Sequence, residues 1–338
     1  MRIQAIKAEK FCQRSRQALT QSSFTASASE HAEEFLACSV KAWAMKVDVV
    51  YTWVDGGNPQ YWEVVRQYAT APKDLNPERF RDDYQMLRYS MRALHQFAGD
   101  WVGKIFVLTA RPQCPPWLNR DHPDVILKHH DEFFSDPGVL PTFSCLNIET
   151  EMHHLPCSDP FLYFNDDYLL GAPVTPEQFC RDGNIRVFGT LFGERFPWRI
   201  RQGGISLGFT EHTPIWIDKT AYAATNRHFE ELYRRTLHCR FRQDWNFRIE
   251  RAYRYYLLAH TKKRRAVPFW QALREVAFHK ITNDEVKQQR QLARIERRRP
   301  PFICLNDDQG DQPNPRVIEL VQNFLERYYP TPSPWEKN

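Results

Sequence analysis

Blocks of apolar residues recur along the first half of the chain, separated by polar stretches. Runs rich in β-branched and aromatic residues are typical of buried strands, and they occur at 47–54, 104–109, 124–129 and 161–164. Leu87, Met91 and Leu94 recur at helical spacing and predict a helix over 82–97. A second helix is expected over 145–155.

Strands that alternate with helices predict an α/β fold: a Rossmann-like core with a mainly parallel sheet and helices on its faces. Ligands of such folds bind at the carboxyl ends of the strands. Asp55 follows the first predicted strand, and Asp166 and Asp167 follow the fourth. We therefore expect these three carboxylates to point into one crevice.

The alternation of apolar strands and amphipathic helices weakens after Gly171. Residues 172–215 read as loop-rich, with 201–209 as a flexible segment. Thr282 and Glu285 fit a capping box that opens a basic helix ending near Arg299. The remaining predicted helices of this mainly helical C-terminal part are 220–236, 247–261 and 315–329.

Domain boundaries follow from the same pattern. Residues 1–44 are small and polar with no strong period, which predicts a poorly ordered extension or translation from Met45. Residues 45–338 are predicted to form one catalytic domain, with a Rossmann-like half (45–171) and a loop-rich, helical half (172–338).

Charge and cysteine content limit the classes of binding partner and the cellular compartment that we expect. The net charge of +5 argues against a general nucleic-acid binder. The basic segment 262–299 could meet phosphates, an acidic polymer or an anionic membrane surface, and a solvated charged helix stays open. Eight cysteines without a CxxC pair, no secretory signal and no long apolar stretch favour a cytoplasmic protein, with peripheral contact at the inner face of the membrane as a further option.

Several residues could carry chemistry. Adjacent acids at a strand end, such as Asp166 and Asp167, can hold Mg²⁺ or Mn²⁺ against a substrate phosphate, although Asn-Asp runs also form ordinary turns. Arg88 could neutralise a phosphate or pair with a nearby acid, and His212 could act as a general base. No P-loop, GxGxxG or GxSxG motif is present, which disfavours P-loop kinases, nicotinamide dehydrogenases and α/β-hydrolases.

Four blocks in order resemble one family. The chain is similar to the Stealth-type sugar-phosphate transferases over about residues 47–336, and the blocks are DVVYTWVDG (48–56), RFRDDYQMLRYSMRAL through FLYFNDDYLL (79–170), EHTPIWIDKTAYAAT with CRFRQDW (211–245), and FICLNDD onward (302–336). The family includes bacterial capsular polysaccharide phosphotransferases and the animal N-acetylglucosamine-1-phosphotransferase.

The resemblance implies a hexose-1-phosphate transferase. It would move a sugar-1-phosphate from a nucleotide sugar, typically a UDP-sugar, to a hydroxyl of an acceptor glycan, in capsule or exopolysaccharide synthesis. Asp166 and Asp167 would hold the metal and take part in catalysis with His212, Arg242 and Asp307. The nucleotide sugar would be bound by Asp48, Thr52, Trp53, Asp55, Arg88 and Asn306.

Two other functions fit part of the pattern. A metal-dependent glycosyltransferase would use the same acids but attack the anomeric carbon and release UDP. A non-catalytic glycan or nucleotide-sugar binder would keep the binding residues without turnover, and the joint presence of Asp55, Arg88, Asp166, Asp167 and His212 argues against it.

Overall fold

The computed structural model describes residues 46–190, 208–209 and 212–337. The predicted N-terminal extension over 1–44 and most of the predicted flexible segment 201–209 lie outside the described residues. The predicted division of 45–338 into two halves stays a prediction.

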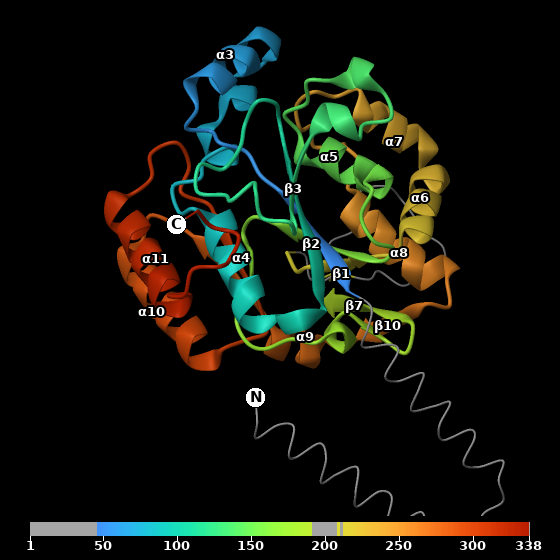
Figure 1. Ribbon diagram of the computed structural model, residues 1–338. Helices are drawn as coiled ribbons and strands as arrows, with labels where there is room; N and C mark the ends of the chain where they lie inside the picture. The colour runs from blue at the N-terminus through green and yellow to red at the C-terminus, as the bar shows by residue number, and fades with distance from the viewer. Residues whose placement is uncertain (1–45, 191–207, 210–211, 338) are drawn as a thin grey trace, which may run out of the picture. The chain divides into compact units, whose positions relative to one another are not determined.

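A five-stranded sheet forms the centre of the described chain (Figure 1). Its order is β3-β2-β1-β4-β9, and the first four strands run parallel while β9 is antiparallel to β4. The bounds are β1 Val47–Thr52, β2 Val102–Thr109, β3 Val125–His129, β4 Phe161–Asn165 and β9 Ile215–Ile217. The four predicted strands and the mainly parallel α/β architecture are confirmed. Continuous apolar runs mark these strands because both faces of the sheet are covered.

Helices lie on both sides of this sheet (Figure 1). Helix α4 (Met86–Phe97) packs near β1, where the Ser90 hydroxyl donates a hydrogen bond to the Tyr51 hydroxyl at 3.1 Å. It begins four residues later than predicted, because Asp82 lies in the preceding turn and accepts a hydrogen bond from the Met86 amide at 3.1 Å. The other predicted helix of this half is α5 (Cys145–Glu151), extended by a 3₁₀ turn at Met152–His154.

The chain then crosses from the central sheet into a second one. After β4 it turns at Asp166 and Asp167 into β5 (Tyr168–Leu170). Strand β5 belongs to a three-stranded sheet of order β11-β12-β5, with β11 at Val276–Ile281 and β12 at Phe302–Asp307. Strand β12 is parallel to β11 and antiparallel to β5, and the pairing with β5 puts the carboxyl end of β12 beside the turn at Asp166.

The prediction of a loop-rich stretch over 172–215 is wrong for its described part. A further sheet, of order β10-β7-β6 with β8 beside β7, uses this region. Its strands are β6 Cys180–Arg181, β7 Asn184–Thr190, β8 Gly208–Phe209 and β10 Arg264–Val267. The pairing of β7 with β10 joins segments that are distant in sequence, which no local pattern reveals.

The C-terminal helices follow the predictions with two corrections. The helix predicted over 220–236 is two helices, α6 (Lys219–His228) and α7 (Glu230–Leu237), broken at Phe229. Helix α10 is capped by Asp284, whose side chain accepts from the Lys287 amide, so the predicted Thr282–Glu285 capping box is wrong. The remaining helices are α3 Pro59–Tyr68, α8 Ile249–His260, α9 Phe269–Glu275, α10 Glu285–Arg298 and α11 Pro315–Tyr328.

The basic segment 262–299 therefore spans β10, α9, β11 and α10 rather than one solvated helix. Helices α10 and α11 lie side by side at one edge of the view in Figure 1.

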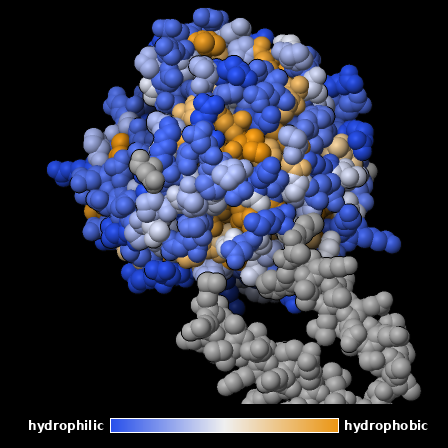
Figure 2. Space-filling view, in the orientation of Figure 1, coloured by the Kyte–Doolittle hydropathy of each residue, from blue (hydrophilic) through white to orange (hydrophobic). Residues whose placement is uncertain are grey.

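The face shown in Figure 2 is mostly hydrophilic, with apolar patches gathered near its middle. Among the described helices, none combines the length and the hydropathy needed to cross a bilayer. Short 3₁₀ helices complete the fold at Pro72–Leu75, Pro77–Arg79, Gly99–Trp101, His130–Glu132, Pro137–Val139 and Pro176–Gln178.

Candidate active site

Two Asn-Asp-Asp motifs meet at the carboxyl ends of β4 and β12. Asp167, at the start of β5, is the point of contact. Its Oδ1 accepts a hydrogen bond from Asn165 Nδ2 at 2.9 Å, and its Oδ2 accepts from Asn306 Nδ2 at 3.4 Å. The carbonyl of Asp167 also accepts from the Leu305 amide at 3.2 Å. Asp167 and Asn306, 139 positions apart, thus belong to one polar cluster.

Asp166 adds a second carboxylate to this cluster. Its Oδ1 accepts a hydrogen bond from the Asp167 amide at 3.0 Å. Burial raises the pKa of Asp166 well above its usual range, and the carboxylates of Asp167 and Asp82 raise it further. Three acids that lie this close together favour a positively charged ligand.

His212 reaches the same cluster from the loop before β9. Its backbone has a positive φ of 62°, and its ring stacks on Phe278 with centroids 4.8 Å apart. The ring atom Nδ1 is buried and has no hydrogen-bond partner among the residues that the structure describes. An imidazole nitrogen left in this state is available to a bound hydroxyl.

One group among the described residues has the spacing to hold a metal ion: Asp167, His212 and Cys304, whose ligand atoms lie within 4.8 Å of one another. A mixed oxygen, nitrogen and sulfur set is the kind that zinc prefers. Burial raises the pKa of the Cys304 thiol well above its usual value, however, and the thiol donates a hydrogen bond to Asp167 Oδ2 at 3.3 Å. Cys304 therefore acts as a protonated donor, and the carboxylates of Asp166 and Asp167 are the donors suited to a hard cation.

A hydrogen-bond relay extends the cluster under the sheet edge. Thr52, the last residue of β1, donates through its hydroxyl to Asn165 Oδ1 at 3.1 Å and lies 3.2 Å from the Tyr163 hydroxyl. The Tyr163 hydroxyl in turn donates to Glu149 Oε1 at 3.3 Å. The relay links Asp167 to a buried acid of α5.

Glu149 and Glu250 form a second pair of carboxylates. Burial raises the pKa of Glu149 well above its usual range, and the charge of Glu250 adds to this shift. Glu250, on α8, also has a raised pKa because of burial, which Arg254 and His212 partly offset. The positive charge of Arg242 lowers the pKa of Glu149, which places this predicted site residue beside the pair.

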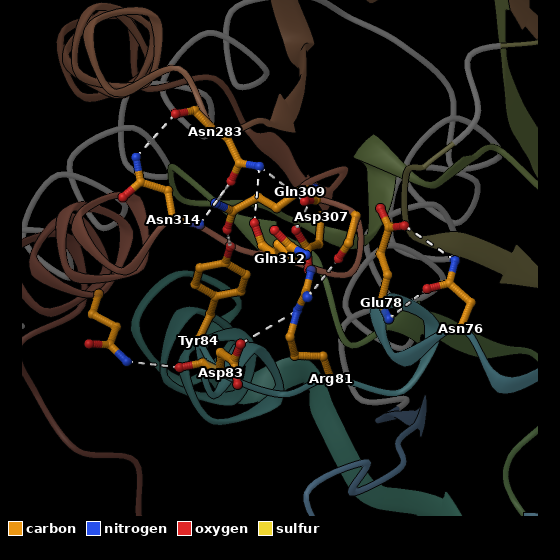
Figure 3. Close-up of polar contacts among 12 residues, drawn as sticks. Asn76, Glu78, Arg81, Asp83, Tyr84, Asn283, Asp307, Gln309, Gln312 and Asn314 are labelled. Atoms are coloured by element: carbon orange, nitrogen blue, oxygen red, sulfur yellow. Dashed lines mark hydrogen bonds and ion pairs between the residues drawn. The ribbon is translucent and has the colours of Figure 1, made fainter.

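Asp307 is held by an arginine from the loop before α4. Arg81 Nε donates to Asp307 Oδ2 at 2.9 Å, and Arg81 Nη1 donates to the Gly310 carbonyl at 2.8 Å (Figure 3). Beside them, Tyr84 bonds to Gln309, and Asn283 accepts from Gln309 Nε2 at 2.7 Å (Figure 3). These contacts fix the end of β12 against the start of α4.

Trp53 and Asp55 lie on the loop that follows β1. Trp53 Nε1 donates to Asp82 Oδ2 at 2.9 Å. The Asp55 carboxylate accepts from the Gly57 amide at 2.8 Å, and its backbone is held by Gln113. The Asp55 carboxylate therefore stabilises the turn of this loop. Its negative charge adds to the burial that raises the pKa of Asp82.

Asp48 and Arg88, two of the predicted site residues, are bonded away from this cluster. Asp48 lies at the opposite, amino end of β1, where it accepts hydrogen bonds from the amides of Ser158 and Lys104 at 2.8 and 2.7 Å. Arg88 donates to Glu336 Oε2 at 2.6 Å, on the C-terminal segment. Of the predicted site residues, the structure thus brings together Thr52, Asp166, Asp167, His212 and Asn306. Asp307 is bonded to Arg81, and the charge of Arg242 lowers the pKa of Glu149.

The sequence prediction left out Glu149, Glu250 and Cys304 and did not assign Arg81 a partner. Glu149 follows Leu146 by three positions inside a predicted helix, so it resembles an ordinary polar face residue. Cys304 sits in an apolar run and resembles a core residue. Only the tertiary fold shows that these side chains are buried beside one another.

The chain matches two family descriptions. Residues 79–188 match Stealth protein CR2, conserved region 2, and residues 293–338 match Stealth protein CR4, conserved region 4. It is 33% identical over 323 residues to the exopolysaccharide phosphotransferase SCO6023 of Streptomyces coelicolor, covering 86% of this chain and 52% of that protein. It is 30% identical to the exopolysaccharide phosphotransferase CpsY of Mycobacterium tuberculosis, covering 86% of this chain and 58% of that protein. The chain thus spans between half and three fifths of the length of these relatives.

Among solved structures, the chain has a remote likeness to the galactosyltransferase LgtC, with a TM-score of 0.43 and 10% identity over 85% of this chain and 96% of that chain. The bifunctional glycosyltransferase WbbM gives a TM-score of 0.44 and 11% identity, covering 86% of this chain and 50% of that chain. Likeness at this level transfers neither a ligand nor a reaction.

Proposed function

Since this chain belongs to the Stealth family, we propose that it transfers a sugar-1-phosphate from a nucleotide sugar to a hydroxyl of an acceptor glycan. The donor is a UDP-sugar and the product is a phosphodiester of an exopolysaccharide or capsule. Relatives named exopolysaccharide phosphotransferases support the reaction class.

The reaction is an in-line displacement at the β-phosphorus of the donor. The acceptor oxygen forms a bond to this phosphorus, the bond to the oxygen that bridges the two phosphorus atoms breaks, and UMP leaves. The acceptor proton passes to a base on the protein. Positioning and charge neutralisation carry most of such a phosphoryl transfer.

His212 is the residue best placed to take the acceptor proton. Within the described part of the chain its Nδ1 has no competing hydrogen bond, and the stacking of its ring on Phe278 fixes the orientation. A carboxylate of the cluster is the second choice. Arg242, beside Glu149, supplies positive charge toward the donor phosphates.

Mg²⁺ or Mn²⁺ would be held by Asp166 and Asp167, where it offsets negative charge on the donor pyrophosphate. The fit rests on the two adjacent carboxylates of the turn; burial, together with the charges of Asp167 and Asp82, raises the pKa of Asp166. Asn165 and Asn306 orient Asp167 through their side-chain amides. Thr52 positions Asn165 from the end of β1.

The observation that carries this proposal is the meeting of the two Asn-Asp-Asp motifs at Asp167, with His212 in the same cluster. Residues from β4, β12 and the loop before β9 converge at the carboxyl end of the central sheet, where α/β folds bind their ligands. Acids and a histidine at such a point fit a site for a phosphorylated donor.

The nucleotide released from the donor tests the proposal. Purified protein is incubated with Mg²⁺ or Mn²⁺, a panel of UDP-sugars and a capsule-type oligosaccharide, and UMP is separated from UDP. Acceptor-dependent UMP supports attack at phosphorus. Release of UDP would show attack at the anomeric carbon and replace the proposal with a glycosyltransferase. Binding of the nucleotide sugar without release of either product would show a non-catalytic binder.

A further inference from the structure

Large apolar side chains stay exposed along one short part of the chain, from α9 to β11. Trp270 and Leu273, on α9, are 67% and 55% exposed, and Phe278, on β11, is 44% exposed. Trp270 and Leu273 are three positions apart, so they lie on the same side of their helix. Exposed apolar residues that gather in this way mark a surface that another molecule covers. We refer to these three side chains and the groove beside them as the α9 face.

The groove of the α9 face lies between α9, β11 and α10 and carries positive charge. Leu273 and Phe278 line it, together with Arg294 and Arg298 of α10, and its volume is about 300 Å³. Neither arginine forms an ion pair with an acid in the described part of the chain. Burial, together with the charge of Arg294, lowers the pKa of Arg298, so the two guanidinium groups lie near one another. Two such charges beside apolar surface favour an anionic partner.

The wider basic segment 262–299 adds to this charge. It holds 12 lysines and arginines against 4 acids. Glu275, Glu285 and Glu296 each pair with an arginine outside the segment, and Asp284 caps α10. Because these carboxylates bind groups other than the segment's own cations, most of its positive charge remains available to a partner.

We propose that the α9 face docks on the surface of a bilayer that contains anionic phospholipids. Trp270 and Leu273 enter the boundary between the headgroups and the acyl chains, where apolar side chains leave water and a tryptophan ring finds its preferred environment. The lipid phosphates pair with Arg294 and Arg298 at the groove. Apolar burial and charge attraction together give reversible binding of the protein to the membrane surface.

A soluble polyanion is the other occupant that fits the arginines. It would pair with Arg294 and Arg298 but would leave Trp270 and Leu273 in water, because a highly charged polymer offers no apolar phase. A bilayer surface supplies phosphate groups and apolar burial together, which accounts for both the charge and the exposed apolar side chains of the α9 face.

Docking through the α9 face brings the candidate active site close to the membrane. The ring of Phe278 belongs to this face and stacks on His212 with the centroids 4.8 Å apart. The inference goes beyond the proposed function, and it holds whichever bond the protein forms.

Flotation of the full chain with lipid vesicles tests this inference. One set of vesicles is phosphatidylcholine alone, and the other is equal parts of phosphatidylcholine and phosphatidylglycerol. We expect the wild type to bind the mixed vesicles at least about tenfold more tightly than the neutral ones, and to lose most of this difference in high salt. This comparison needs no variant, so it stands whether or not a substituted protein folds.

Two variants separate apolar insertion from charge attraction. Trp270→Ser/Leu273→Ser removes the exposed apolar side chains of α9, and Arg294→Gln/Arg298→Gln removes the two charges of the groove. Each should bind the mixed vesicles at least about tenfold more weakly than the wild type, with an unchanged circular dichroism spectrum.

The matched controls change exposed residues outside the α9 face. They are Val64→Ser/Leu75→Ser and Arg66→Gln/Arg120→Gln. Val64 and Arg66 belong to α3, which lies at the opposite end of the view in Figure 1 from α9. Both controls should bind the mixed vesicles within about twofold of the wild type.

A wild type that binds the mixed vesicles no better than the neutral ones would overturn the inference, as would an unchanged affinity in either α9-face variant. Binding of dextran sulfate that depends on Arg294 and Arg298, without binding of vesicles, would replace the lipid surface by a soluble polyanion. These outcomes are independent of the nucleotide that the protein releases, so they are distinct from a failure of the proposed function.

Discussion

Arg81 holds Asp307 in place, with Nε donating to Oδ2 at 2.9 Å, across more than two hundred residues of sequence. The Arg81 side chain is only 9% exposed, and the Asp307 side chain 18%. A charge-assisted hydrogen bond in this setting positions the end of β12 and with it Asn306.

Replacing Arg81 should therefore affect turnover through position rather than through donor binding alone. We expect Arg81→Gln to lower kcat for UMP release by about tenfold or more, and Arg81→Lys to recover part of it, since lysine keeps the charge but not the paired N–H groups. Steady-state kinetics measures both. Arg316→Gln, at an arginine 80% exposed, is the control and should match the wild type. A kcat for Arg81→Gln within twofold of wild type would rule out the positioning role.

The two acids of the turn should be essential for turnover. Asp166→Asn and Asp167→Asn remove the negative charge and keep the shape, so we expect kcat to fall by about a hundredfold or more with the circular dichroism spectrum unchanged. Asp308→Asn is a matched control, because Asp308 ends the second motif and, among the described residues, its side chain pairs with exposed Lys280. Retained activity in either of the first two variants would remove that residue from the site.

Substitution of Cys304 distinguishes a metal site made of carboxylates from one that includes the Cys304 thiol. If the cation is held by carboxylates, Cys304→Ser should keep activity within about threefold, since serine still offers a donor to Asp167. The protein is first treated with EDTA, and activity is then restored with Mg²⁺, Mn²⁺ or Zn²⁺. A loss of metal affinity of more than about tenfold in Cys304→Ser, with recovery by Zn²⁺ alone in the wild type, would point to Asp167, His212 and Cys304 as the ligands.

Glu149 should make stability depend on pH. Its pKa is raised in the folded protein by burial and by Glu250, so folding favours the protonated acid. The folded state then loses stability as pH rises above about 4.3, the usual pKa of an unfolded glutamate. Glu149→Gln should therefore be more stable than wild type at pH 8, by about 1 kcal/mol or more, and equal to it near pH 4. Urea unfolding of metal-free protein at both pH values measures this, and a variant less stable than wild type at pH 8 would contradict it.

The stability with which the C-terminal segment is held should depend on one buried acid, Glu336. Glu336 is 6% exposed and accepts from Arg92 Nε at 2.9 Å and from Arg88 at 2.6 Å. Because Arg92 is itself buried, Glu336→Gln should lower the free energy of unfolding by about 3–5 kcal/mol. Glu326→Gln removes a 57% exposed partner of Arg92 and should change it by about 1 kcal/mol or less. Equal losses in the two variants would show that burial of the pair is unimportant.

The sequence predicts β1, β2 and β4 well because most residues on both faces of these strands are buried, so their apolar runs are long. It misses β10, whose residues Arg264–Val267 carry no such run and become a strand only by pairing with β7. Short strands of this kind are stabilised by distant partners, and a local pattern contains no information on them.

The same limit applies to the site. Asp166 and Asp167 could be predicted because they follow a recognisable strand, and His212 and Asn306 through the family blocks. Arg88 was expected near phosphates, yet in this structure it bonds to Glu336, a residue 248 positions away. Glu149 has an ordinary helical context, and only the folded chain buries it beside Glu250.

The turn between β4 and β5 has a mechanical meaning. Strand β4 belongs to the central sheet and β5 to the sheet with β11 and β12, so Asp166 and Asp167 form a joint between two sheets. Asp167 accepts hydrogen bonds from Asn165 of β4 and from Asn306 and Leu305 of β12, so this one residue is tied to both sheets. A ligand bound to its carboxylate therefore contacts the central sheet and the three-stranded sheet through a single side chain.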